Sequence, residues 1–124
     1  MNNKLNSINY KYDDTVDALM IKVNNYAHES TVPLTDDIIM DLNKKDEFIG
    51  LEILDASKLL DASPESLKNI IAIDLIVKVT NYQIFISAIF TLPIHNHEEI
   101  KVANTTLIND INIPLMDKKL VTAV

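Results

Sequence analysis

The stretch Glu47-Phe-Ile-Gly-Leu-Glu-Ile-Leu-Asp-Ala-Ser-Lys58 is the most informative part of the sequence, because it contains the chain's only glycine and a carboxylate two residues beyond it. Its alternating pattern predicts a β-strand in which Gly50 and Glu52 lie on the same face. A glycine inside a strand lowers stability and usually marks a β-bulge or a close approach of another backbone or a ligand. We therefore predict such a feature at Gly50.

Two β-hairpins are predicted in the first half of the chain. Residues 38–42 alternate in polarity and are followed by turn residues at 43–46, so they pair with the strand that contains Gly50. Residues 5–13 and 18–23 form the first hairpin along the chain, joined by an acidic turn whose short carboxylates can bind nearby backbone N–H groups, so the hairpin of residues 38–54 is the second. The segment 24–33 is polar and predicts irregular structure, with Pro33 at a strand edge or in a loop.

The second half of the chain begins with a helical signal. Ser63 is a good N-cap and Pro64 suits the first helical position, so we predict a short helix near residues 55–69. Alternating residues then predict strands at 71–79 and 82–92. After Pro93 and a polar loop at 95–99, three shorter extended segments are predicted: 100–103, 107–113 and 119–124.

These patterns predict a mainly β protein, of the α+β class with little helix. Closely joined strands cannot be parallel neighbours, so antiparallel hairpins and a meander should form one or two packed sheets. We expect a single domain over residues 1–124. Residues 1–62 would form a two-hairpin unit, and residues 63–124 a short helix followed by a β-meander.

Composition narrows the classes of partner. The chain has 124 residues, no cysteine and a formal net charge of −7, and all eleven basic residues are lysines. Nucleic acid is disfavoured as a partner, since phosphate backbones are bound by clustered Lys and Arg. No signal peptide pattern and no apolar run of about 20 residues is present, so we expect a cytoplasmic protein without a membrane segment.

Four short segments of the sequence resemble one family. They are Tyr12-Asp13, Asp17-Ala-Leu-Met-Ile21, Asp36-Asp-Ile-Ile-Met-Asp41 and Gly50-Leu-Glu-Ile-Leu-Asp-Ala-Ser57. In order and spacing they resemble the prokaryotic domain-of-unknown-function family 2283 over about residues 10–60. The resemblance implies a compact two-hairpin β unit in a small stand-alone or accessory protein; it suggests partner binding without showing it and brings no established chemistry. The family tends to carry a glycine in its second turn, where this chain has Lys45-Asp46.

Gly50, Glu52 and Asp41 are the candidate residues for binding a ligand or partner. Glu52 and Asp41 can form a carboxylate pair across the second hairpin, an arrangement that also suits acid–base chemistry. Carboxylates on the outward face of a half-buried hairpin are usually solvated, however. We therefore expect solvated side chains and no catalytic residue.

The sequence His95-x-His97-Glu98-Glu99 is the best candidate for a metal site. Imidazole and carboxylate groups suit zinc or another divalent ion, which leaves a small metal-dependent hydrolase as the alternative function. A polar loop between strands has the same composition, and we expect no cofactor. With no cysteine, no Gly-x-Ser-x-Gly context and one glycine, the chain lacks the usual nucleophile and phosphate-binding signals. A small binding or protein-interaction module is the function we expect.

The strand predicted at 82–92 is apolar on both faces. Phe85 and Ile89 lie opposite Ile86 and Phe90, and an uncovered apolar face favours association. We therefore predict a homodimer with the carboxyl half forming much of the contact. The alternative is that the tail folds back over Phe85 and Ile89 and completes a monomeric sandwich.

Overall fold

Nine β-strands and two short helices make up the computed structural model, which describes residues 7–122. The strands are β1 (Ser7–Asp13), β2 (Ala18–Val23), β3 (Ser30–Pro33), β4 (Ile38–Leu42), β5 (Phe48–Ile53), β6 (Ala72–Val79), β7 (Gln83–Ile94), β8 (His97–Ile108) and β9 (Met116–Thr122). The helices are α1 (Ala56–Leu59) and α2 (Pro64–Lys68), which follow one another between β5 and β6.

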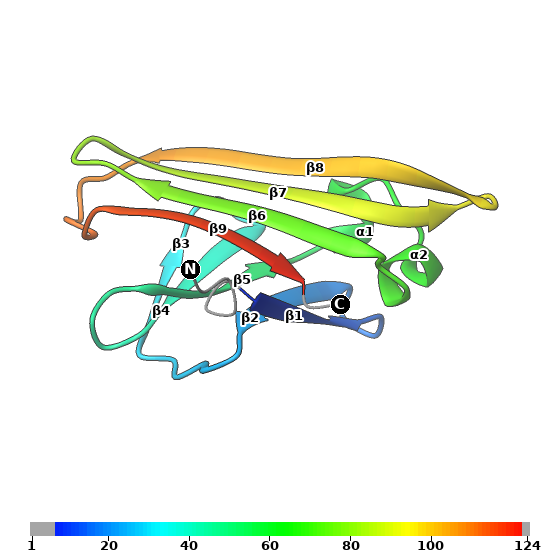
Figure 1. The fold of residues 1–124 in the computed structure, drawn as a ribbon, viewed down its shortest axis with the longest axis horizontal. Coiled ribbons are helices and arrows are strands. Elements are labelled where there is room, and N and C mark those ends of the chain that lie inside the picture. The colour runs from blue at the N-terminus through cyan, green and yellow to red at the C-terminus, as the bar shows by residue number, and fades with distance from the viewer. Residues whose placement is uncertain (1–6, 123–124) are drawn as a thin grey trace.

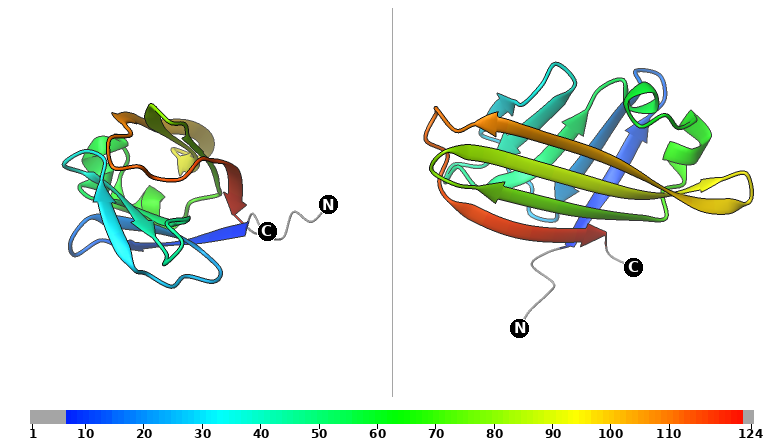
Figure 2. Two further views of the ribbon diagram at one scale, coloured as in Figure 1. Left: turned by 90° about the vertical axis from the view of Figure 1, so that its left-hand side faces the viewer. Right: turned by 90° about the horizontal axis from the view of Figure 1, so that it is seen from above.

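All nine strands belong to one sheet with the order β3-β4-β5-β2-β1-β9-β6-β7-β8. Every pairing is antiparallel except that of β1 with β9, which joins the amino-terminal five strands to the carboxyl-terminal four. The sheet curls so that these two groups form facing layers (Figures 1 and 2). The predicted fold class, mainly β with antiparallel hairpins and little helix, is confirmed.

The core lies between the two layers. Alternate residues of each strand point inward, and the largest fully buried side chains come from both layers, including Leu19, Leu51, Leu75 and Phe90. Every buried side-chain N and O atom in residues 7–122 has a hydrogen-bond partner. Burial of apolar area between the layers is therefore the main stabilising contribution, and it is not opposed by unpaired polar groups.

Helix α2 begins as predicted. The Ser66 amide donates a hydrogen bond to Ser63 Oγ at 3.2 Å, and Pro64 occupies the first turn. Ser66 Oγ in turn donates to the Pro93 carbonyl at 2.8 Å, which fastens α2 to β7. Neither helix in the described residues has the length or the apolar character needed to cross a membrane.

Three predicted boundaries are wrong. The segment predicted as irregular contains β3, a four-residue edge strand that ends at Pro33. The polar loop predicted at 95–99 is a two-residue turn, His95-Asn96, in which both residues have positive φ. Strand β8 begins directly after it, so two of the predicted tail segments are replaced by one continuous strand. The first residues of β8 are polar, as is common on an edge strand, and their polarity led to the prediction of a loop.

The end of β8 is set by one buried amide. Asn109 donates to the carbonyls of Thr80 and Ile113 at 2.9 and 3.0 Å and accepts from the Ile113 amide at 3.0 Å. These bonds turn the chain, so residues 109–113 do not extend the strand as predicted. The predicted strands also included Leu5, Asn6, Ala123 and Val124, which lie outside the described residues.

Candidate functional site

Four residues form a row across the outer face of the amino-terminal layer, the face turned away from the core. Strand pairing places Thr31 of β3 beside Asp41 of β4, Asp41 beside Gly50 of β5, and Gly50 beside Lys22 of β2. Glu52 lies two residues along β5 from Gly50 and so faces the same side. The structure therefore brings together the three residues that the sequence suggested for binding.

Gly50 provides space for an aromatic ring. A Cβ atom at this position would lie 3.0 Å from the Ile21 carbonyl oxygen and 3.2 Å from Cε2 of Tyr26. The register of β4 and β5 also shifts between Asp41 and Leu42, next to this glycine. The prediction that this glycine marks either a bulge or a close approach is confirmed by the close approach of Ile21 and Tyr26.

Asp41 is fully buried, so the prediction that it is solvated is wrong. Tyr26 Oη donates a hydrogen bond to Asp41 Oδ2 at 3.0 Å, and Thr31 Oγ1 lies 3.5 Å from Oδ1. His28 Nε2 is 3.8 Å from the same Oδ1. The segment between β2 and β3 covers the carboxylate, which hydropathy alternation along β4 cannot indicate.

Glu52 has an unfavourable environment for its charge. Burial and the neighbouring negative charge of Asp41 raise the pKa of Glu52, although His28 and Lys22 partly oppose the shift. Burial and the hydrogen bond to Asp41 raise the pKa of Tyr26 to about 12. At neutral pH the phenol of Tyr26 is therefore a stable donor, while a negative charge on Glu52 is less favourable than on a free glutamate.

An aromatic surface lies over this pair. The rings of Tyr26 and His28 are stacked, with centroids 6.3 Å apart and planes inclined by 19°. The ammonium group of Lys22 sits 4.7 Å from the centroid of the Tyr26 ring, within the range of a cation–π interaction. His28 Nε2 also contacts Thr31 Oγ1 at 2.8 Å. We call Lys22, Tyr26, His28, Thr31, Asp41 and Glu52 the carboxylate cluster.

Four members of this cluster were missed by the sequence analysis. The position of Lys22 follows from the pairing of β2 with β5. The position of Thr31 follows from the pairing of β3 with β4, once β3 is recognised as a strand. Tyr26 and His28 belong to the connection between β2 and β3, and their contacts depend on how that connection folds back. No spacing in the sequence indicates this.

The metal candidates lie elsewhere, at the turn between β7 and β8. His97 Nε2 contacts Glu99 Oε2 at 2.9 Å, and its Nδ1 lies 3.1 Å from the His95 carbonyl. Within residues 7–122, His, Asp and Glu side chains form no group of three arranged to hold a metal ion. His95, His97 and Glu98 instead line one side of an open groove of about 910 Å³, with α2 residues on the other side.

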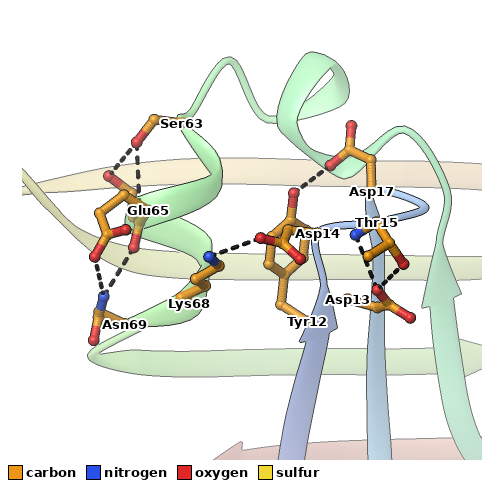
Figure 3. Close-up of polar contacts among 10 residues, drawn as sticks. Tyr12, Asp13, Asp14, Thr15, Asp17, Ser63, Glu65, Lys68 and Asn69 are labelled. Carbon is orange, nitrogen blue, oxygen red and sulfur yellow. Dashed lines mark hydrogen bonds and ion pairs between the residues drawn. The ribbon is translucent and has the colours of Figure 1, made fainter.

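A second acidic cluster is built around Asp17 in the turn between β1 and β2 (Figure 3). Asp17 accepts a hydrogen bond from Tyr12 Oη at 2.6 Å and two from Ser57, from its amide at 3.0 Å and its Oγ at 2.7 Å. Partial burial alone would raise the pKa of Asp17, but these donors outweigh it and lower the pKa. In the same turn Asp13 accepts from the Thr15 amide, as predicted for an acidic turn.

Both acidic clusters lie in the part of the chain that is similar to a known family. Residues 9–57 match the profile of a family described as "Protein of unknown function (DUF2283)". The predicted family resemblance is confirmed. The DUF2283 match runs from β1 into α1 and contains both acidic clusters in full.

One curated relative extends over most of the chain. A Methanosarcina mazei protein named "Putative hypoxanthine phosphoribosyltransferase" is 28% identical over 106 residues, which are 86% of this chain and 85% of that protein. No solved structure matches the chain at a significant level. The family that the chain resembles is itself described as being of unknown function, so the resemblance indicates no activity.

Proposed function

We propose that this protein is a small binding module whose carboxylate cluster recognises a basic side chain, lysine or arginine, of a partner protein. The observation that carries the proposal is the placement of Glu52 beside the buried Asp41, where one more negative charge is unfavourable. A partner's ammonium or guanidinium group would offset that charge. It would also find the Tyr26–His28 surface, where the chain's own Lys22 already makes this type of contact.

Binding fits the cluster better than catalysis does. Asp41 has no exposed surface, and its oxygens are occupied by hydroxyl donors. A general acid or base must be within hydrogen-bond reach of its substrate. Glu52 alone is open, and a single carboxylate with no neighbouring nucleophile provides few steps of a reaction. In recognition, the carboxylate of Asp41 can attract a partner's positive charge without being in direct contact with it.

The relative's name suggests purine phosphoribosyl transfer as another function. Enzymes that bind phosphate groups use glycine-rich loops or helix N-termini, because backbone N–H groups must approach the oxygens. The one glycine here lies inside β5 beneath Tyr26, and the longer described helix has five residues. These features favour recognition of a basic group over recognition of a sugar phosphate. The open groove near His95 gives little support for a hydrolase, since both ring nitrogens of His97 contact groups of its own hairpin, the His95 carbonyl and the Glu99 carboxylate.

A peptide titration tests the proposal. ¹⁵N-labelled protein is titrated with an acetylated, amidated tetralysine peptide, and amide shifts are followed. We expect the largest shifts at Tyr26, Gly50 and Glu52, and we expect Glu52→Gln to abolish them. Asp36→Asn removes one charge from an exposed residue that is not a member of the cluster and should leave the shifts unchanged.

Two results would overturn the proposal. One is a diffuse shift pattern over the acidic surface that Glu52→Gln does not alter, which would show nonspecific charge attraction. The other is turnover of hypoxanthine with 5-phosphoribosyl 1-diphosphate, or zinc-dependent hydrolysis lost in His97→Ala, either of which would show an enzyme.

A further inference from the structure

The two edges of the sheet differ in how they are protected. Edge strand β3 has four residues and ends at Pro33, which has no backbone N–H to offer. Edge strand β8 has twelve residues, contains no proline, and pairs with β7 from end to end without a register shift. Its other side pairs with no strand in the described part of the chain. Long, regular edges are sites of association unless they are blocked.

Strand β8 also carries exposed apolar side chains on its outer face. Ile100, Val102 and Ile108 are 59%, 50% and 72% exposed. On the adjacent strand, Phe85 and Ile89 of the same face are half-buried, and they pair with Thr106 and Val102. The apolar surface therefore reaches the open edge of the sheet, where a partner strand would extend it.

The distribution of charge along β8 suits one partner in particular, a second copy of the same strand. The charged residues Glu98, Glu99 and Lys101 all lie in the first half of β8, whereas residues 103–108 carry no charge. In an antiparallel pair related by a two-fold axis, the charged half of one copy faces the uncharged half of the other. Like charges directly opposite each other would destabilise the pair, and this arrangement avoids them.

We propose that β8 pairs with β8 of a second copy about a two-fold axis at Val102, to form an isologous homodimer. Outer-facing residues must lie opposite outer-facing residues, so the axis passes through one residue. An axis at Val102 pairs all residues from His97 to Leu107 and places the two Val102 side chains against each other, with Ile100 diagonal to them. This interface is separate from the carboxylate cluster, which lies near the opposite edge of the sheet.

Cysteine substitution tests this register directly, because the natural chain has no cysteine. Directly opposed residues have Cβ atoms about 4.5–5.5 Å apart, close enough for a disulfide after small adjustments. We expect Val102→Cys to form a disulfide-linked dimer under mild oxidation. Asn104→Cys, exposed on the same face of the same strand, would lie opposite Ile100 and should stay monomeric on a non-reducing gel. Val16→Cys controls for random collision, since Val16 is 65% exposed in the turn between β1 and β2, outside β8.

Light scattering over a dilution series measures the assembly itself. The wild type should have twice the 14.0 kDa mass of one chain. Val102→Lys would place two ammonium groups together at the axis and should return the mass to one chain, while Val16→Lys should not. Circular dichroism checks that each variant is folded.

Three results would overturn the proposal. The first is a wild-type mass of 14.0 kDa at every concentration. The second is disulfide formation by Asn104→Cys or Val16→Cys as readily as by Val102→Cys. The third is a dimer that survives Val102→Lys and is lost in Phe85→Lys/Ile89→Lys, which would indicate face-to-face packing instead of edge pairing.

Discussion

The same pair of side chains, a tyrosine and an aspartate, occurs in two places with different surroundings. Tyr12 donates to Asp17 at 2.6 Å, and Tyr26 donates to Asp41 at 3.0 Å. In both pairs burial and the aspartate raise the pKa of the phenol to about 12. The tyrosines are therefore equivalent in protonation, and the difference lies in what else contacts each aspartate.

The neighbours of the aspartate separate a structural link from a candidate binding site. Asp17 receives further hydrogen bonds from Ser57, so its charge is satisfied and joins the β1–β2 turn to α1. Asp41 has Glu52 as a neighbour, and the pKa of that second carboxyl is raised. A carboxylate that accepts several hydrogen bonds stabilises the fold. A second carboxylate placed beside a first can instead gain a favourable interaction from a positively charged ligand.

The largest effect is expected from Asp17→Ala. The substitution removes three hydrogen bonds to a charged acceptor and leaves Tyr12 and Ser57 without their partner, so it should lower the free energy of unfolding by about 3 kcal/mol. Asp17 also has φ of 53°, which adds a backbone cost for alanine. Urea unfolding at neutral pH measures the change.

Two controls make the Asp17 result specific. Asp17→Asn tolerates the positive φ and keeps hydrogen-bonding capacity, so it should cost clearly less than alanine. Asp14→Asn removes a charge from the same turn, where Asp14 makes an exposed ion pair with Lys68, and should leave the midpoint unchanged (Figure 3). Equal losses in all three variants would mean that the turn responds to net charge and that the Asp17 hydrogen bonds are unimportant.

The second effect tests the other aspartate through its support. Gly50→Val would place methyl groups against the Ile21 carbonyl and the Tyr26 ring and should cost about 2 kcal/mol by overpacking. The displaced ring would also uncover Asp41. Tyrosine fluorescence and urea midpoints report the two consequences, and Gly50→Ala should show a smaller loss of each. An unchanged urea midpoint and unchanged fluorescence in Gly50→Val would show that the position of the Tyr26 ring does not depend on the absence of a side chain at residue 50.

Much of this architecture was predictable because strands, turns and caps are local. The hairpins around the acidic turn and around residues 43–46, the N-cap at Ser63 and the close approach at Gly50 all depend on residues near one another in sequence. The pairing of Asp41 with Glu52 was also predictable, since strand register places them on one face.

The burial of Asp41 was not predictable, because a loop supplies it. Tyr26 and His28 reach Asp41 across 15 and 13 residues, and no periodicity indicates that the loop folds back. The long β8 was missed for the opposite reason: an exposed edge strand needs no alternation of buried residues. Alternation along a strand indicates which residues face the core of a sheet. It cannot indicate that a loop covers Asp41, or that one side of β8 has no neighbouring strand among residues 7–122.

The third prediction uses pH to separate Asp17 from the carboxylate cluster. The folded-state pKa of Asp17 is lower than its ordinary value of 3.8, so its stabilising contribution is present above that value and is lost as the pH falls through the folded-state pKa. Asp17→Asn should therefore flatten the acid side of a stability–pH curve. A variant as acid-sensitive as the wild type would show that other carboxylates cause the acid loss.

The smallest effect, and the most informative about function, is expected from Glu52→Gln. The folded-state pKa of Glu52 is raised above its ordinary value of 4.5, so stability is full below that value and is lost as the pH rises through the folded-state pKa. Glutamine stays neutral, so the variant should be as stable as the wild type in acid and at least as stable at neutral pH. Urea midpoints measured across this range would show it, with Glu98→Gln as the same chemical change on an exposed side chain. A stabilised variant that no longer binds the lysine peptide would mean that the unfavourable charge is retained for recognition, since residues kept for function often lower stability. A marked loss of stability at neutral pH would instead place Glu52 with Asp17, as a carboxylate held by donors, and the distinction between the two clusters would fail.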